Sequence, residues 1–169
     1  MKLKEVFDSP QSWKQIQSTS SDPADRKQPN QANKPMWGED SYNFRIGGNK
    51  YIVRFPQGVS NEFQIKGAPD DIPKQFDYVS FELNDSDEIM GTGNAYKVFS
   101  TVLDIIKNHK RRVGVPVLAQ AKGNEPSRIK LYSRMFDKIA SHKWETKISK
   151  DDFEAETLGG EHHVINWMI

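Results

Sequence analysis

The sequence predicts an α/β protein of the α+β type, with a central mixed, mostly antiparallel sheet and helices packed on it. Apolar residues alternate over residues 42–55, which is the period of a half-buried strand, and residues 76–83 form the strongest strand pattern of the chain. Two segments with helical apolar spacing follow, each next to a short apolar strand. The length of 169 residues fits one domain, or two at most.

Residues 1–41 are expected to form an N-terminal arm outside the folded domain. Apolar residues in 1–16 predict a short helix of one or two turns. Residues 17–41 are rich in Ser, Pro and Asn and have no periodicity, so we expect a flexible loop or a partner-binding arm. The folded domain is then residues 42–169.

The first half of that domain reads as strands. Tyr42, Phe44 and Ile46 alternate, a Gly-Gly-Asn turn follows at 47–49, and apolar residues alternate again over 51–55. This pattern predicts a β-hairpin. Residues 61–66 are expected to add a short strand, and residues 76–83 one continuous strand.

The second half alternates helices and strands. Apolar residues at helical spacing predict a helix from Ala95 to about Lys110 and another from Pro126 to about Ser141. Between them, residues 115–121 read as a buried strand, and residues 144–149 and 161–168 as two final strands. The two strand–helix–strand passages favour neighbouring strands in one sheet.

Composition excludes several classes of protein. The chain has no cysteine, so a disulfide scaffold, a thiolate nucleophile and a cysteine-ligated zinc site are excluded. Its apolar runs are too short for a membrane span, and charges stand where a signal peptide needs an apolar stretch. The four histidines have no spacing typical of metal ligands, so no metal is expected. We therefore expect a soluble, intracellular protein that does not bind a membrane.

The net charge of +1 conceals an uneven distribution of acidic and basic residues along the chain. Residues 67–90 carry a net −6, whereas residues 107–143 carry +8. Lys130, Arg134 and Lys138 recur every four residues, so they share one face of the second helix. This basic segment has three open interpretations: contact with nucleic acid, contact with an acidic protein surface, or a solvated face.

A glycine-containing turn joins the strongest strand to the first helix. Gly91, Thr92, Gly93 and Asn94 allow a tight turn, and the helix N-terminus that follows offers free N–H groups to an anion. No Gly-Lys-Ser/Thr follows, and a third glycine is absent, so a P-loop and a Rossmann fingerprint are excluded. Two interpretations stay open: an anion site, or a turn in which Thr92 or Asn94 caps the helix.

This order of strand, glycine turn, helix, buried strand and helix resembles the core of the GNAT acyltransferases. That family binds acetyl-CoA through a Gln/Arg-x-x-Gly-x-Gly/Ala turn and commonly has a Leu-Tyr pair in the next helix. Residues 88–93 (EIMGTG) match the glycines but place Glu88 at the Gln/Arg position, and residues 128–132 (RIKLY) match the Leu-Tyr end. The sequence of residues 76–169 also resembles those of small uncharacterised proteins of tailed bacteriophages.

The resemblance implies an acyl-CoA-dependent N-acyltransferase, located in the host cytoplasm or the virion. Glu82 would be the general base and Tyr132 the acid that protonates the leaving thiolate. The residues that would hold acetyl-CoA are Leu83, Gly91, Thr92, Gly93, Asn94 and Arg128.

Two further interpretations of the same resemblance need no catalysis. One is a non-catalytic phage protein that binds a host protein, a virion component or nucleic acid through Lys130, Arg134 and Lys138. The other is a structural virion protein whose polar N-terminal arm is an assembly tether.

Overall fold

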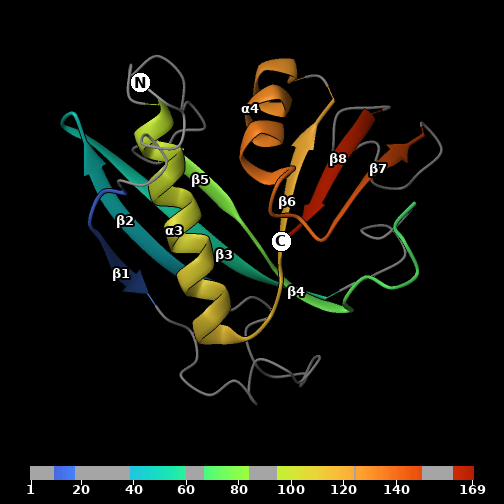
Figure 1. Cartoon of the computed structure of the whole chain (residues 1–169), viewed down its shortest axis with the longest axis horizontal. Helices are drawn as coiled ribbons and strands as arrows, with labels where there is room; N and C mark the ends of the chain where they lie inside the picture. The colour runs from blue at the N-terminus through green and yellow to red at the C-terminus, as the bar shows by residue number, and fades with distance from the viewer. Residues whose placement is uncertain (1–9, 18–38, 60–66, 84–94, 124, 150–161) are drawn as a thin grey trace. The chain divides into compact units, whose positions relative to one another are not determined.

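The fold is known from a computed structural model, which describes residues 10–17, 39–59, 67–83, 95–123, 125–149 and 162–169. It is a mixed α+β protein with two sheets and two helices in these ranges (Figure 1). Neither of the two helices in the described ranges combines the length and apolar character that crossing a membrane requires. The chain divides into two compact units, a first unit of residues 1–58 and 77–115 and a second unit of residues 59–76 and 116–169.

The first unit contains an antiparallel sheet in the order β1-β2-β3-β5. Its strands are β1 (Trp13–Gln17), β2 (Glu39–Ile46), β3 (Asn49–Val59) and β5 (Ser80–Leu83). Gly47 and Gly48 connect β2 to β3 with φ values of 57° and 83°. Both residues need positive φ in the tight turn that matches the twist of a hairpin, which explains the two glycines.

Helix α3 (Ala95–Val113) lies along one face of this sheet (Figure 1). Alternation along β2 and β3 places one set of apolar side chains on that face, and the helix contributes its own apolar stripe. These side chains form the core of the first unit: Tyr42, Phe44, Ile46, Tyr51, Val53, Phe55, Val98, Phe99, Val102, Ile105 and Ile106.

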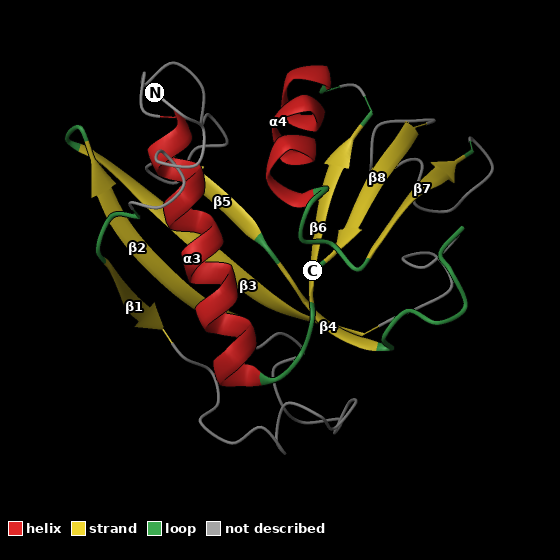
Figure 2. Cartoon of the chain, viewed as in Figure 1, coloured by secondary structure: helices red, strands yellow, loops and turns green. Residues whose placement is uncertain are grey.

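The second unit contains an antiparallel sheet in the order β6-β8-β7. The strands are β6 (Val117–Lys122), β7 (His142–Ile148) and β8 (His162–Met168), and helix α4 (Pro126–Phe136) packs on β6 (Figure 2). Trp167 and Phe136 are fully buried, and their rings lie 6.0 Å apart between centroids. The remaining strand, β4 (Gln75–Tyr78), begins in the second unit and ends in the first.

The sequence located most of these elements correctly. The β2–β3 hairpin, α3, β6, α4, β7 and β8 are confirmed, although their ends differ by a few residues. The strand expected over 76–83 is interrupted at Val79, which separates β4 from β5. The strand expected over 61–66 lies outside the described residues.

Two expectations about local structure were wrong. The helix expected within 1–16 is absent from the described residues 10–16, where the strand β1 begins at Trp13, pairs with β2 and donates a hydrogen bond from Trp13 Nε1 to Asp104 on α3 (2.8 Å). Residues 1–9 of that prediction lie outside the described residues. Helix α4 ends at Phe136 rather than near Ser141, because Ile139 and Ala140 both donate to the Phe136 carbonyl in a closing turn. Tertiary and turn hydrogen bonds override helical spacing at both places.

We expected two strands joined by a helix to lie next to each other in the sheet, and this prediction is wrong in the second unit. Strands β6 and β7, which α4 connects, do not pair with each other; each pairs with β8. The last strand of the chain therefore occupies the centre of this sheet, an order that local patterns cannot specify.

Candidate functional site

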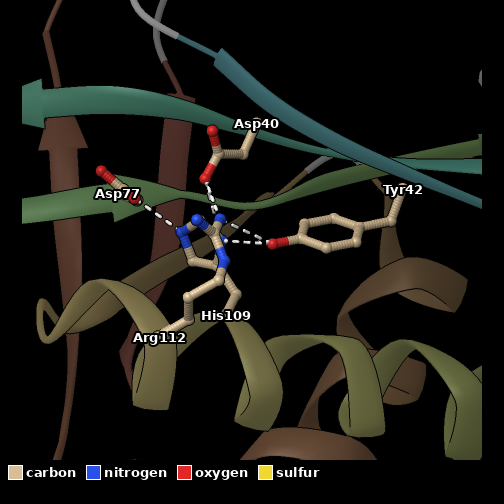
Figure 3. Close-up of polar contacts among 5 residues, drawn as sticks. All are labelled: Asp40, Tyr42, Asp77, His109 and Arg112. Carbon is tan, nitrogen blue, oxygen red and sulfur yellow. Dashed lines mark hydrogen bonds and ion pairs between the residues drawn. The ribbon is translucent and has the colours of Figure 1, made fainter. Parts of the chain in front are cut away.

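The first unit contains a cluster of five polar side chains, four of them buried and one part-exposed, contributed by β2, β4 and α3 (Figure 3). Asp40 and Tyr42 lie on β2, Asp77 on β4, and His109 and Arg112 on α3. Charged groups are rarely buried unless they are paired and hydrogen-bonded. In this cluster the buried polar side chains are one another's hydrogen-bond partners.

His109 lies at the centre of the cluster and is fully buried. Its Nε2 lies 2.6 Å from Asp77 Oδ2, and its Nδ1 lies 3.1 Å from the Tyr42 hydroxyl oxygen. The imidazole also stacks on Phe55, with 3.9 Å between ring centroids and an interplanar angle of 8°. A neutral ring with the proton on Nε2 satisfies both contacts, since Nε2–H donates to Asp77 and Nδ1 accepts from Tyr42.

Arg112 connects the cluster to solvent. Its Nη2 donates to the Tyr42 hydroxyl (2.9 Å) and to the carboxylate of Asp40, which is itself fully buried. Burial disfavours the charged guanidinium, but the hydrogen bonds to Tyr42 and Asp40 outweigh it and raise the pKa of Arg112. The Arg112 side chain is 35% exposed, whereas Asp40 and His109 are fully enclosed.

The line Asp77–His109–Tyr42 has the geometry of an acid–histidine–hydroxyl relay. A nucleophile must be reached by its substrate, however, and the Tyr42 residue is 1% exposed. The cluster therefore fixes α3 against β2 and β4 and does not act on a substrate in this conformation. Its two carboxylates face opposite nitrogens of the ring, so they do not converge as metal ligands would.

The sequence analysis missed this cluster, although one signal was present. His109 falls on the apolar stripe of α3, four residues after Ile105 and three after Ile106, where a polar side chain needs a buried partner. The partners Asp40 and Asp77 are 69 and 32 residues distant in sequence, and only the fold brings them together.

The predicted catalytic residues belong to different units. Glu82 lies on β5 opposite Ile52 of β3, and Leu83 is opposite Tyr51. Tyr132 lies on α4 in the second unit and is only 7% exposed. Its ring contacts those of Phe136 and Trp167 at 5.4 and 6.0 Å between centroids, so it is part of the aromatic core of that unit.

The predicted cofactor-binding residues are only partly described. Gly91, Thr92, Gly93 and Asn94 lie outside the described residues, and α3 begins at the next residue, Ala95. Arg128 on α4 forms an ion pair with Glu125 (3.1 Å), and both side chains are about one-third exposed.

The predicted basic row on α4 is exposed. Lys130 and Arg134 lie on the helix and Lys138 in the turn that follows it, and all three are exposed. Among the residues that the structure describes, none of the three has an ion-pair partner. This arrangement leaves three positive charges on the surface of the second unit.

In the second unit, Ser141, His142 and Asp71 contact one another in the order of a Ser–His–Asp triad, but they are not arranged to act as one. His142 contacts Ser141 Oγ through Nδ1 (3.0 Å) and Asp71 through Nε2 (3.1 Å). Ser141 Oγ also donates to the Met168 carbonyl (3.2 Å), so its proton is not directed at the imidazole. The hydrogen bond from His142 lowers the pKa of Asp71, but the side chain of Asp71 is 77% exposed, as expected of a surface ion pair.

No group of three or more metal-ligating side chains occurs in the part of the chain that the structure describes. No protein-family model, curated protein or solved structure matches this chain, so no relative assigns a role to any of these residues.

Proposed function

We propose that the chain is a phage-type GNAT-like protein that binds an acyl-CoA and transfers its acyl group to an amine. The order strand, helix, strand, helix that this family implies corresponds to β5, α3, β6 and α4. The observation that carries the proposal is the start of α3. This helix of 19 residues begins immediately after Gly91–Asn94 and has no acidic side chain in its first turn. Its positive dipole end is therefore not neutralised by an acid of its own first turn.

In this proposal the residues of the first unit carry the chemistry. Backbone N–H groups of Gly91–Asn94 hold the pyrophosphate, and the backbone at Leu83 pairs with the pantetheine arm. Glu82 takes the proton from the attacking amine, whose nitrogen bonds to the thioester carbon while the bond from that carbon to sulfur breaks, and the leaving thiolate takes a proton from water. Tyr132 and Arg128, the acid and the phosphate contact that the resemblance implies, belong to the second unit and have no step in this proposal.

Calorimetric titration with acetyl-CoA, with free CoA alongside, tests the proposal. Micromolar binding corresponds to about 8 kcal/mol and is measured directly. Glu82→Gln should abolish turnover with little change in binding, while Glu145→Gln, at a part-exposed glutamate of the second unit, should leave both unchanged. Absence of heat and of a thermal shift at millimolar acetyl-CoA would overturn the proposal.

A second function is favoured by the basic row on α4. Lys130, Arg134 and Lys138 lie exposed, and within the described part of the second unit they have no ion-pair partner. Three such charges four residues apart match the negative charges of nucleic acid or of an acidic host or virion protein. In this alternative, the GNAT-like domain binds a partner without catalysis.

Charge reversal tests this second function. Replacement of all three bases by glutamate should weaken binding to a duplex DNA probe, and the salt dependence of the remaining binding should lose about 2.7 units of log–log slope. The matched control reverses Lys74, Lys122 and Lys147, which are also exposed. Equal loss in both triple variants would show a general charge effect, and an unchanged slope would exclude DNA contact through this row.

A further inference from the structure

The first unit contains a hollow that no predicted role uses. It measures about 440 Å³ and lies between the start of β1 and the β2–β3 hairpin. That volume is within the range of about 300–1,000 Å³ typical of small-molecule sites. Two runs of the chain line it, residues 11–14 and 43–45, together with Lys50, and none of these described residues is acidic.

Strand alternation divides this lining between the two faces of the sheet. Trp13 and Phe44 are opposite each other, on the face that carries α3 (Figure 1). Phe44 is buried there, and Trp13 Nε1 donates to Asp104 of α3 (2.8 Å). Both rings therefore belong to the core side of the sheet and not to the outer face.

The outer face of the sheet carries the charged part of the lining. Asn43 and Arg45 are two residues apart on β2 and share this face. Lys14 of β1 is opposite Asn43, and Lys50 of β3 is opposite Arg45. Four neighbouring positions on three strands thus present three bases and one amide on the same side of the sheet.

Lys14 and Arg45 are the two of these bases that can take up a new ligand. Both are exposed, and among the residues that the structure describes neither has an ion-pair partner. Lys50 is half-buried and already takes part in another interaction, so its charge is partly used. Two available cations beside one hollow match a group with two negative charges, and a phosphate monoester carries about −1.5 to −2 at pH 7.

The uncharged lining indicates what the phosphate is attached to. Ser12 and Asn43 bring a hydroxyl and an amide, which both donate and accept hydrogen bonds. Because the two rings of the lining belong to the core side, the outer side of the hollow has no aromatic surface among its lining residues on which a nucleobase would stack. The hydroxyl groups of a sugar suit such a surface, since each of them also donates and accepts.

We propose that this hollow binds a sugar phosphate. Lys14 and Arg45 bind the phosphate, and Ser12 and Asn43 bind hydroxyl groups of the sugar. The site is on the face of the first sheet away from α3, and the inference does not depend on acyl transfer.

Calorimetry on the full chain at physiological salt tests the site with three probes: glucose 6-phosphate, inorganic phosphate and glucose. We expect glucose 6-phosphate to bind most tightly, inorganic phosphate about threefold to tenfold more weakly, and glucose weakest, because hydrogen bonds to charged groups are about twice as strong as neutral ones. Inorganic phosphate binding as tightly as glucose 6-phosphate would overturn the role of the sugar. No binding of either phosphate at millimolar concentration would overturn the site.

The double variant Lys14→Gln/Arg45→Gln removes both available charges. Its control is Lys122→Gln/Lys147→Gln, which makes the same charge change at exposed positions of the second unit. The first should weaken glucose 6-phosphate about tenfold or more, and the control less than about twofold. Because Lys14 and Arg45 are exposed, the thermal midpoint without ligand should change little. Equal weakening in both double variants, or loss of binding only together with unfolding, would contradict the proposal.

Discussion

Replacement of His109 by leucine tests whether the buried cluster fixes α3 to its strands. His109 is fully buried, with Nε2 2.6 Å from Asp77 Oδ2 and Nδ1 3.1 Å from the Tyr42 hydroxyl. Leucine fills most of the same space but makes neither hydrogen bond. The Asp77 carboxylate, at a residue that is 4% exposed, would then lose its histidine partner inside the protein.

The expected loss of stability follows from these contacts. A hydrogen bond to a charged group contributes about 1.5–3 kcal/mol, and one between neutral groups about 1 kcal/mol. Removal of the donor also leaves the buried Asp77 carboxylate short of one hydrogen bond, which adds a desolvation penalty of about 1–3 kcal/mol. We therefore expect His109→Leu to lower the free energy of unfolding by about 3–5 kcal/mol.

Urea unfolding followed by tryptophan fluorescence measures this change, and amide exchange in α3 assigns it to the first unit. His163→Leu is the matched control, since His163 is half exposed and pairs with Glu145 on the surface. A surface pair of this kind contributes at most about 1 kcal/mol. A loss below about 1 kcal/mol for His109→Leu would refute the reasoning.

The double variant His109→Leu/Asp77→Leu separates the lost hydrogen bond from the cost of a buried carboxylate that has lost this donor. Replacing both partners by apolar residues removes the desolvated carboxylate as well as its hydrogen bond. We expect the double variant to be more stable than the sum of the single losses by about 1–3 kcal/mol. Strict additivity would mean that His109 contributes through packing on Phe55 rather than through the cluster.

Two further predictions concern the second unit and the turns. Burial tends to raise the pKa of Asp137, but hydrogen bonds from Lys143 and from the indole N–H of Trp167 outweigh it and lower this pKa. Asp137→Asn should therefore lower the free energy of unfolding by up to about 1 kcal/mol at neutral pH. This contribution is present above the ordinary aspartate pKa of 3.8 and is lost as the pH falls through the lowered pKa, so acid unfolding curves of variant and wild type should converge in strongly acidic solution. Gly67 has φ +77°, and a Cβ there would lie 2.8 Å from the backbone oxygen of Glu145. Gly67→Ala should lower the thermal midpoint more than Gly48→Ala, which has φ +83° and open space, and equal losses would rule out the clash.

The sequence predicted the elements of the fold better than their arrangement. Alternation along β2 and β3 and helical spacing along α3 are local, and burial on one face enforces both. The strand β1 escaped prediction because its apolar residues fit a helix equally well, and the hydrogen bond from Trp13 to Asp104 decides between them. The central position of β8 could not be predicted for a similar reason, because the pairing of strands depends on contacts between residues far apart in the sequence.

The candidate sites divide in the same way. The basic row on α4 follows from a spacing of four residues, and Lys130, Arg134 and Lys138 are exposed as predicted. The buried cluster depends instead on the fold, because its members come from β2, β4 and α3, which are far apart in sequence.

Strand β2 presents different chemistry on its two faces. Its alternation directs Asp40 and Tyr42 to the face that carries α3, where acid and hydroxyl meet His109 and Arg112. The same alternation directs Arg45 to the opposite face, where the residue is exposed. The two faces should therefore respond differently to substitution: Arg45→Glu should change the free energy of unfolding by less than about 0.5 kcal/mol, whereas the cluster variants should lower it much further. A loss in urea unfolding of Arg45→Glu as large as that of His109→Leu would contradict this division.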